Sequence, residues 1–246
     1  MKTLILSDLH LRWQTADKII KHVGADKIVF LGDFFDDFGD DYQTNLQMAE
    51  WLAASLEQPN RIHLFGNHDI SYAIARKDYK CSGYEVGKDR AINSVLKKED
   101  WKKLQLYTWV GDYLCSHAGV HNYFHELFSN GMPVKTWLED VAKRAMDKAW
   151  ALQPVHPLLE AGRSRGGYSK HGGIIWCDVN EFVPILGVKQ IFGHTPCRKP
   201  KWIIMGDEKD PLYTENIDLD VHTQYYAIHD DAKETNKLTT HWIGDM

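Results

Sequence analysis

Side chains of the types that bind divalent metal ions recur along the chain, each shortly after a short apolar run. Hydrolysis of a phosphate ester at neutral pH needs a nucleophile made from water and positive charge around the phosphoryl oxygens. Two metal ions roughly 3.5–4 Å apart can supply both. One carboxylate must then bridge the ions, while imidazoles and an amide oxygen complete each ligand shell. The side chains that could do this are Asp8, His10, Asp33, Asn67, His117 and His194.

Taken one at a time, these residues have ordinary structural explanations. Gly32-Asp33 after an apolar run is often only a turn. Gly66-Asn67-His68-Asp69 can be a turn with a capped helix after it, and a lone histidine is more often structural. Their combination and order favour a metal site. Asp8 and His10 alternate along a stretch that we expect to be extended, so both should point the same way.

The elements that must position these residues begin with three short apolar runs, each ending in polar residues. Helical patterns lie between the runs, which predicts an α/β fold with parallel strands. In such folds ligands bind outside the carboxyl ends of the strands. All three runs carry Asp, Asn or His at that end. The expected strands are 2–6, 27–31 and 61–65, and the expected helices are 14–23 and 44–56, the second capped by Thr44.

The remainder of the chain is less regular, and it contains no repeat, low-complexity tract or convincing linker. A single domain spanning residues 1–246 is the simplest organisation. Residues 161–173, rich in Gly, Arg and Ser, are expected to form a loop. Further strands are expected at 112–115, 188–192, 201–205, 212–217, 224–229 and 237–243, the last four antiparallel, and a helix at 135–152.

The composition is that of a globular protein, with 43% hydrophobic and 12% aromatic residues among 246. A formal net charge of −5 argues against nucleic acid as the main partner, because bulk positive charge is absent. No apolar run approaches the about 20 residues that a membrane span needs, and no signal peptide is recognisable. We therefore expect a cytoplasmic protein with no membrane partner and with reduced cysteines.

The polar motifs resemble, in their order along the chain, those of the calcineurin-like metallophosphoesterases: Asp8-Leu9-His10, Gly32-Asp33-Phe34-Phe35-Asp36, Gly66-Asn67-His68-Asp69, His117 and Gly193-His194-Thr195. The resemblance implies a two-sheet α/β sandwich flanked by helices. It also implies two divalent metal ions, for which manganese, iron and zinc are all suitable. One ion would take Asp8, His10 and Asp33. The other would take Asp33, Asn67, His117 and His194, with Asp33 as the bridge.

The family pattern also assigns roles beside the metals. A hydroxide that bridges the two ions would attack phosphorus in line with the leaving oxygen. His68 would protonate the leaving oxygen as general acid, and Asp36 would hold the other ring nitrogen of His68. Asp69 would orient the site or cap a helix, and we expect His121 to be a surface histidine.

The last motif indicates a branch within the family. Gly193-His194-Thr195-Pro196 lacks the second histidine of many phosphodiesterases and resembles the phosphoprotein phosphatase branch. That branch includes protein serine/threonine phosphatases and diadenosine tetraphosphate hydrolases, and residues 162–176 are similar to bacterial and phage phosphatases of this type. Two positions depart from the branch pattern. Asp37 replaces an arginine that grips the substrate phosphate, and Asp69 replaces a glutamate.

The substrate phosphate therefore needs another bidentate donor. Arg165 and Arg163 in the expected loop, and Arg12 after the first motif, are the candidates, although exposed arginines are usually only solvated.

The preferred interpretation is a phosphatase that hydrolyses monoesters of a phosphoprotein or a small phosphorylated molecule. The main alternative is a nucleotide phosphodiesterase or pyrophosphohydrolase acting on dinucleoside polyphosphates, with Phe34, Phe35 or Tyr168 stacked on a base. Phe34 and Phe35 suit a core better. A non-catalytic scaffold of the same fold is less favoured, because all six ligands, His68 and Asp36 are present. The oligomeric state is left open.

Overall fold

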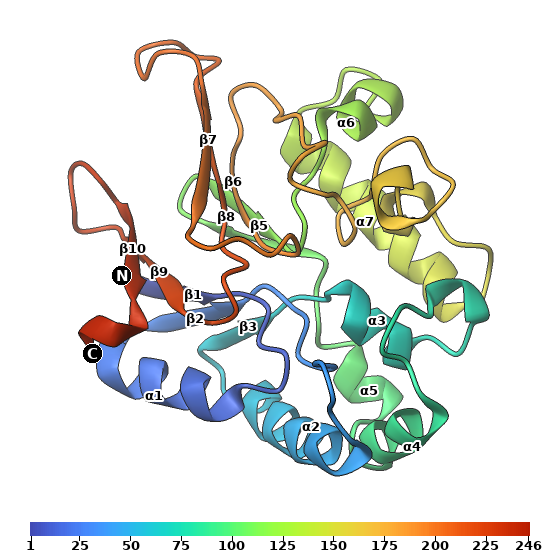
Figure 1. Ribbon diagram of the computed structural model, residues 1–246. Coiled ribbons are helices and arrows are strands. Elements are labelled where there is room, and N and C mark those ends of the chain that lie inside the picture. Colours follow the sequence, from blue (N-terminus) through green and yellow to red (C-terminus); the bar gives the residue numbers. More distant parts are fainter.

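The computed structural model describes residues 1–246 and contains two five-stranded sheets with helices outside them (Figure 1). This arrangement confirms the predicted two-sheet α/β sandwich. The first sheet runs in the order β10 (Leu238–Trp242), β9 (Tyr225–Asp230), β1 (Lys2–Leu6), β2 (Lys27–Phe30) and β3 (Arg61–His63). The second runs in the order β4 (Tyr107–Val110), β5 (Tyr113–Ser116), β6 (Lys189–Phe192), β8 (Thr214–Asp218) and β7 (Lys201–Met205).

In the first sheet, the three opening strands are parallel, as predicted. Leu6 of β1 pairs with Phe30 of β2, and Phe30 in turn pairs with His63 of β3. On its other side β1 pairs antiparallel with β9, with Thr3 opposite His229. The carboxyl ends of β1, β2 and β3 therefore lie at one edge of the sheet, where the polar motifs begin.

In the second sheet, β5, β6 and β8 are parallel to one another. The outer strands β4 and β7 are antiparallel to their neighbours. The prediction of four antiparallel tail strands was therefore wrong in part. β8 is antiparallel to β7 but parallel to β6. β9 and β10 belong to the first sheet, where they pair antiparallel with each other. A local hydrophobic pattern does not reveal which sheet a strand joins.

The core follows the alternation of side chains along each strand. Ile5 and Val29 turn toward the second sheet and pack with Cys115, Ile191 and Ile217 between the sheets. Their neighbours in sequence turn the other way, against the helices. Both faces of the parallel strands are thus buried, as parallel sheets require.

Helices cover the outer faces of the two sheets (Figure 1). α2 begins after Asp41, whose side chain accepts a hydrogen bond from the backbone N–H of Thr44. The predicted cap Thr44 was therefore wrong, because Thr44 is the donor to the cap and lies inside the first turn. The helices are α1 (Trp13–Val23), α2 (Tyr42–Leu56), α3 (Asn67–Ala73), α4 (Val86–Val95), α5 (Lys98–Trp101), α6 (Asn122–Phe128) and α7 (Val134–Trp150). None of them combines the length and the apolar composition that a membrane span requires.

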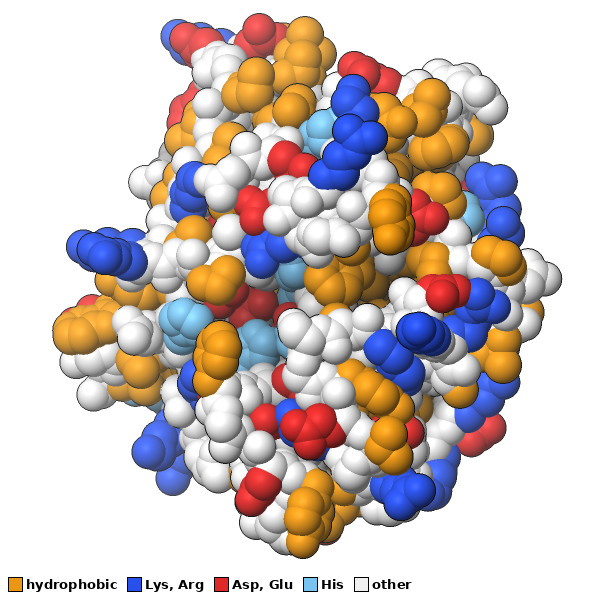
Figure 2. All heavy atoms as spheres, turned by 45° about the vertical axis from the view of Figure 1, so that its right-hand side comes forward, with side chains coloured by type: hydrophobic (Ala, Val, Ile, Leu, Met, Phe, Trp, Pro, Cys, Tyr) orange, Lys and Arg blue, Asp and Glu red, His pale blue; other side chains and the backbone are white.

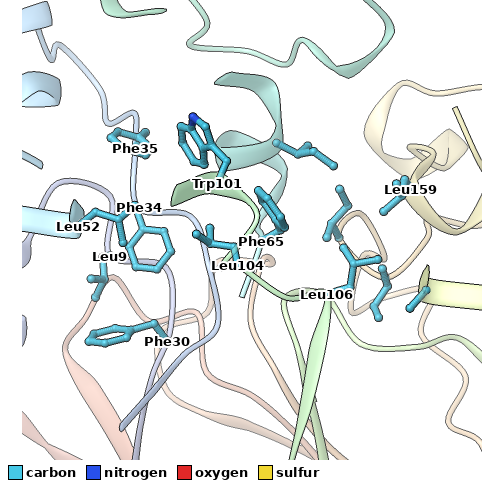
Figure 3. Packing of buried hydrophobic residues seen from close by; sticks show 14 of the residues in the cluster. Leu9, Phe30, Phe34, Phe35, Leu52, Phe65, Trp101, Leu104, Leu106 and Leu159 are labelled. Atoms are coloured by element: carbon cyan, nitrogen blue, oxygen red, sulfur yellow. The ribbon is translucent and has the colours of Figure 1, made fainter. Parts of the chain in front are cut away.

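Aromatic side chains anchor the loops that follow β2 and β3. In Figure 3, Phe35 lies beside Trp101, and Phe34 lies among Leu9, Phe30 and Leu52 in the core. Phe34 and Phe35 have no exposed surface, and Phe35 meets the ring of Trp101 at 5.9 Å between centroids. The backbone of the Gly32–Asp36 segment is therefore held by its own aromatic side chains, which fixes the carboxylates on either side of them.

Candidate active site

The predicted ligands gather where five strands end. Asp8 follows β1, Asp33 follows β2 and Asn67 begins α3 after β3, while His117 and His194 follow β5 and β6 of the second sheet. Figure 2 shows acidic and histidine side chains together in a hollow on this face of the molecule. The carboxyl edges of both sheets thus meet at one place, which is where parallel α/β folds bind ligands.

One group of ligand atoms lies between the two sheets. Nε2 of His117 lies 3.1 Å from Oδ1 of Asn67, 3.2 Å from Nδ1 of His194 and 3.3 Å from Oδ2 of Asp33. Nδ1 of His117 donates to the carbonyl of Leu31 at 3.0 Å, which leaves Nε2 as the nitrogen with a free lone pair. These contacts point lone pairs of four side chains at one small volume.

A second group of ligand atoms consists of Asp8, His10 and Asp33. Nε2 of His10 lies 3.8 Å from Oδ2 of Asp33. Nδ1 of His10 lies 2.6 Å from the carbonyl of Asp36 and donates to it, so Nε2 is again free to bind a metal. The ligand atoms of Asp33, His117 and His194 lie within 4.8 Å of one another, as do those of Asp8, His10 and Asp33, so Asp33 belongs to both groups. The donor set and its spacing fit two cations that share one carboxylate.

The backbone around these ligands departs from the extended conformation that we expected at Asp8 and His10. Asp8 has φ 48°, His10 has φ 39° and Asp33 has φ 53°, all in the left-handed region that L-residues rarely adopt. The carboxylate and the imidazole reach the site because the chain turns tightly, not because it alternates. Glycine is needed beside them, since a side chain at Gly66 or Gly193 would collide with the carboxylates of Asp33 and Asp8.

The electrostatics of the ligands reflect dense burial of opposite charges. Burial alone would raise the pKa of Asp33, but the imidazole of His117 and those around it hold that pKa well below its usual value. Burial lowers the pKa of His117, whereas the Asp33 carboxylate raises it, to about 9. Burial and the neighbouring His117 hold the pKa of His194 far below normal. Burial and the charge of Asp220 raise the pKa of Asp8. Divalent cations would neutralise such a cluster.

His68 and Asp36 form a pair beside the ligands. Nδ1 of His68 lies 2.8 Å from Oδ2 of Asp36, and the backbone N–H of His68 donates to Oδ1 of Asp33 at 2.9 Å. The second carboxylate oxygen of Asp36 accepts hydrogen bonds from Tyr72 at 2.6 Å and from Lys88 at 3.2 Å. Burial lowers the pKa of His68, but Asp33 and the bond to Asp36 raise it well above the usual value. The ring is therefore held in one orientation and favours its protonated form.

Asp69 performs both of the functions considered for it. Its carboxylate accepts three backbone N–H groups at 2.8 Å, those of Gly66, Asp33 and Phe34. The bond to Gly66 caps helix α3, and the other two fix the loop that carries Asp33. Asp69 is fully buried, so it positions the candidate bridging ligand without facing the site itself.

Of the expected candidates for phosphate binding, Arg165 lies beside the group of ligand atoms that contains His117 and His194. Its Nη2 donates to Oγ1 of Thr195 at 2.9 Å and to the carbonyl of His194 at 3.4 Å. Its Nε lies 2.9 Å from Oδ2 of Asp178. Asp178 and Thr195 thus hold this guanidinium directly beside His194, a candidate metal ligand.

Arg12 lies on the other side, beside His10. Its Nη2 forms an ion pair with Oδ2 of Asp37 at 2.8 Å, and its Nη1 lies 3.4 Å from the carbonyl of His10. The acid that replaces the expected arginine therefore binds an arginine from another segment. Arg163 is exposed and makes no side-chain hydrogen bond or ion pair, so the structure does not bring it to the site.

His121 is not the surface residue that we expected. Its side chain is only 4% exposed, it caps helix α6, and its Nε2 lies 2.9 Å from the carbonyl of Glu181. Burial lowers its pKa to about 4. The helix cap and the partner on a distant loop explain its burial, and neither could be inferred from its distance to His117 in the sequence.

Several residues around the site carried no sequence motif. Tyr72 and Lys88 reach Asp36 from helices α3 and α4, and Cys81 lies between them in sequence with its Sγ 3.7 Å from Nδ1 of His68. Asp220 is buried near Asp8. Only Asp220 had a usable signal, because it comes shortly after a strand, as the ligands do.

Carboxylates and imidazoles thus gather at the strand ends of a two-sheet α/β sandwich, where they could hold metal ions. A model of the calcineurin-like phosphoesterase family matches residues 1–198, and the chain therefore belongs to that family.

Solved structures with a similar fold include phosphatases. A cold-active protein tyrosine phosphatase has a TM-score of 0.60 and 16% identity, over 98% of this chain and 76% of the other. A protein serine/threonine phosphatase from Saccharomyces cerevisiae has a TM-score of 0.53 and 16% identity, over 98% of this chain and 79% of the other. A comparison with curated protein sequences gives no significant match. At these identities the likeness establishes the fold alone.

Proposed function

We propose that this calcineurin-like phosphoesterase hydrolyses phosphate monoesters and that two divalent cations bind its six candidate ligands. The position of Asp33 carries the proposal. Its Oδ2 faces His117 at 3.3 Å on one side and His10 at 3.8 Å on the other, so one carboxylate oxygen joins the two groups of ligand atoms. Asp8 and His10 complete one group, and Asn67, His117 and His194 complete the other.

When bound, two such cations offer positive charge to the phosphoryl oxygens and lower the pKa of a water molecule toward neutrality. Oxygen and nitrogen donors in this mixture suit manganese, iron or zinc. The protein contributes the fixed spacing. Hydrogen bonds from His117 to the carbonyl of Leu31 and from His10 to that of Asp36 hold each ring with one nitrogen toward the site.

His68 is placed to protonate the leaving oxygen. Asp36 engages Nδ1, so Nε2 is the atom that can deliver a proton to a substrate. The raised pKa of His68, to which the hydrogen bond to Asp36 contributes, keeps the imidazolium available at neutral pH. Tyr72 and Lys88 hold the far oxygen of Asp36 and prevent the carboxylate from rotating away.

Two arginines support a doubly charged phosphate group as substrate. Arg165 lies beside His194 and Arg12 beside His10, so the guanidinium groups flank the candidate metal centre from two directions. Each is paired with an acid, Asp178 for Arg165 and Asp37 for Arg12, which orients the fork of N–H donors. Planar guanidinium groups bind phosphate oxygens in pairs. Phe34 and Phe35 offer nothing to a nucleotide base, because both are fully buried.

The test compares two chromogenic substrates with manganese added. We expect hydrolysis of para-nitrophenyl phosphate to exceed that of bis(para-nitrophenyl) phosphate, because the arginines favour the dianion. Asp33→Asn should lose both activity and the two bound metals, as measured by elemental analysis. A variant with full metal content would contradict the bridging assignment. Faster hydrolysis of the diester would contradict the proposed phosphatase activity and indicate a phosphodiesterase instead.

A further inference from the structure

Cys81 lies against the candidate general acid, outside both groups of metal ligands. Its Sγ is 3.7 Å from Nδ1 of His68 and 3.6 Å from the carbonyl of Asn67. Oδ2 of Asp36 approaches the same Nδ1 at 2.8 Å. These three side-chain atoms, a thiol sulfur, an imidazole nitrogen and a carboxylate oxygen, lie within 4.8 Å of one another.

We propose that Asp36, His68 and Cys81 form a third cation site, selective for zinc, that inhibits the enzyme when occupied. The inhibition rests on the proposed function, whereas the binding does not. Thiolate, imidazole and carboxylate together are a donor set that zinc prefers, and manganese prefers oxygen ligands instead. The third site therefore differs in its chemistry from the six-ligand centre, which contains no sulfur.

The spacing suits a tetrahedral ion. Bonds of the lengths that zinc makes to nitrogen, oxygen and sulfur place neighbouring ligand atoms roughly 3.5 Å apart. The distance of 3.7 Å between Sγ of Cys81 and Nδ1 of His68 already fits. The hydrogen bond of 2.8 Å between His68 and Asp36 must open by a fraction of an ångström, because the ion takes the place of its proton. The fourth position remains for water.

The charges around Asp36 leave one of its oxygens free for this ion. Lys88 and Tyr72 both bind Oδ1, and Oδ2 faces His68. Asp40 accepts a hydrogen bond from Lys88 at 2.6 Å, so the positive charge of Lys88 is balanced by a second acid. Cys81 is partly exposed, as is the side chain of His68 at 17%, so an ion can enter from solvent.

Zinc binding at this place removes the proton donor. The thiol proton of Cys81 and the Nδ1 proton of His68 pass to solvent, and the ion occupies both positions. The ring keeps one proton on Nε2 but is now neutral and no longer bonded to Asp36. With Nδ1 on the ion and its hydrogen bond to Asp36 lost, the ring no longer has the arrangement of the candidate general acid, so hydrolysis of esters with poor leaving groups should fall sharply.

Cobalt reports on the site without any assay of activity. Cobalt bound to a thiolate gives a strong near-ultraviolet charge-transfer band, and the six-ligand centre cannot give it. We expect the band when cobalt is added to the full-length protein, its loss in Cys81→Ser and Cys81→Ala, and its retention in Cys197→Ser. Cys197 is the matched control, because it is the other partly exposed cysteine. Absence of the band in the unaltered protein, or its persistence in both Cys81 variants, overturns the site.

Zinc inhibition then tests the regulatory part. The concentration of zinc that halves the hydrolysis of an alkyl phosphate should rise at least about tenfold in Cys81→Ser, since replacing even a residue that only supports a metal ligand costs about that much in metal affinity. An equal zinc sensitivity in both proteins contradicts the inhibition. A cobalt band in a protein with no esterase activity would leave the site standing and refute the proposed function. An active phosphatase without the cobalt band would refute the third cation site and leave the proposed function standing.

Discussion

At the scale of single residues, the site depends on three imidazoles that each have one ring nitrogen already hydrogen-bonded. The backbone carbonyls of Leu31 and Asp36 occupy one nitrogen of His117 and of His10, and Asp36 occupies one nitrogen of His68. The residue types and their order could be read from the sequence. The carbonyl partners could not, because they depend on where the loop after β2 passes.

Replacing His68 tests the role of the proton donor. We expect His68→Asn to keep both metals, since His68 is not a ligand, and to lose on the order of 10²–10⁴ in turnover with poor leaving groups. The loss should be much smaller for para-nitrophenyl phosphate, whose leaving group needs little protonation. Steady-state kinetics on alkyl and aryl phosphates measure the difference. Equal losses on both substrates would argue that His68 has another role.

Replacing Arg165 tests which arginine binds the phosphate. Arg165→Ala should lower kcat/KM for a monoester by about 10- to 100-fold, because a charge-assisted hydrogen bond contributes about 1.5–3 kcal/mol. Arg163→Ala is the matched control, since Arg163 lies two positions away but is exposed and unpaired. Its kcat/KM should not change. Similar effects of the two substitutions would remove Arg165 from phosphate binding.

At the scale of elements, the strands and their polar ends were predictable, and the backbone that joins them was not. The apolar runs fixed β1, β2 and β3 to within a residue or two, because buried parallel strands need continuous apolar stretches. The left-handed turn at Asp8 and His10 has no such pattern, since non-glycine residues rarely adopt it. β9 belongs to the first sheet because it pairs with β1, which is distant in the sequence, and a local pattern cannot predict such a pairing.

Strand β3 carries a buried histidine that makes stability depend on pH. His63 is stacked on Phe30, and its Nε2 lies 2.7 Å from Oγ of Ser55. Burial, helped by the charge of Arg61, lowers its pKa to about 3. The unfolded chain, with a pKa near 6.5, binds this proton at a higher pH than the folded chain does. The contribution of His63 is therefore present above about pH 6.5 and is lost as the pH falls toward 3.

The magnitude follows from the same difference. Between pH 7 and pH 5 the unaltered protein should lose about 2 kcal/mol through His63 alone. His63→Gln cannot bind that proton, and its free energy of unfolding should fall by that much less over the same range. Urea titrations of both proteins with chelator present measure this difference and exclude an effect of the metals. Parallel pH profiles would show that His63 is not buried as a neutral ring.

At the scale of the whole molecule, one of the two proposed metals connects the two sheets. Asp8, Asp33 and Asn67 come from the first sheet, whereas His117 and His194 come from the second. A cation bound between them exists only when both sheets are formed and packed together. The chain should therefore be more stable with metals than without them.

Chelation measures this linkage. At a free metal concentration 100-fold above the dissociation constant, each site adds about 2.7 kcal/mol to the free energy of unfolding. Treatment with chelator should lower the thermal midpoint, and added manganese should restore it. Asp33→Asn, which lacks the bridge, should melt at nearly the same temperature under both conditions. An unaltered midpoint in the parent protein would indicate that no metal binds between the sheets.

The place of β1 in its sheet has a consequence for synthesis. β1 leaves the ribosome long before β9, yet β9 is one of its two neighbours, with Thr3 opposite His229. A nascent chain can align β1, β2 and β3, but one flank of β1 stays without its partner until β9 has been synthesised. Asp8, at the end of that strand, is thus made well before the strand that completes the sheet around it.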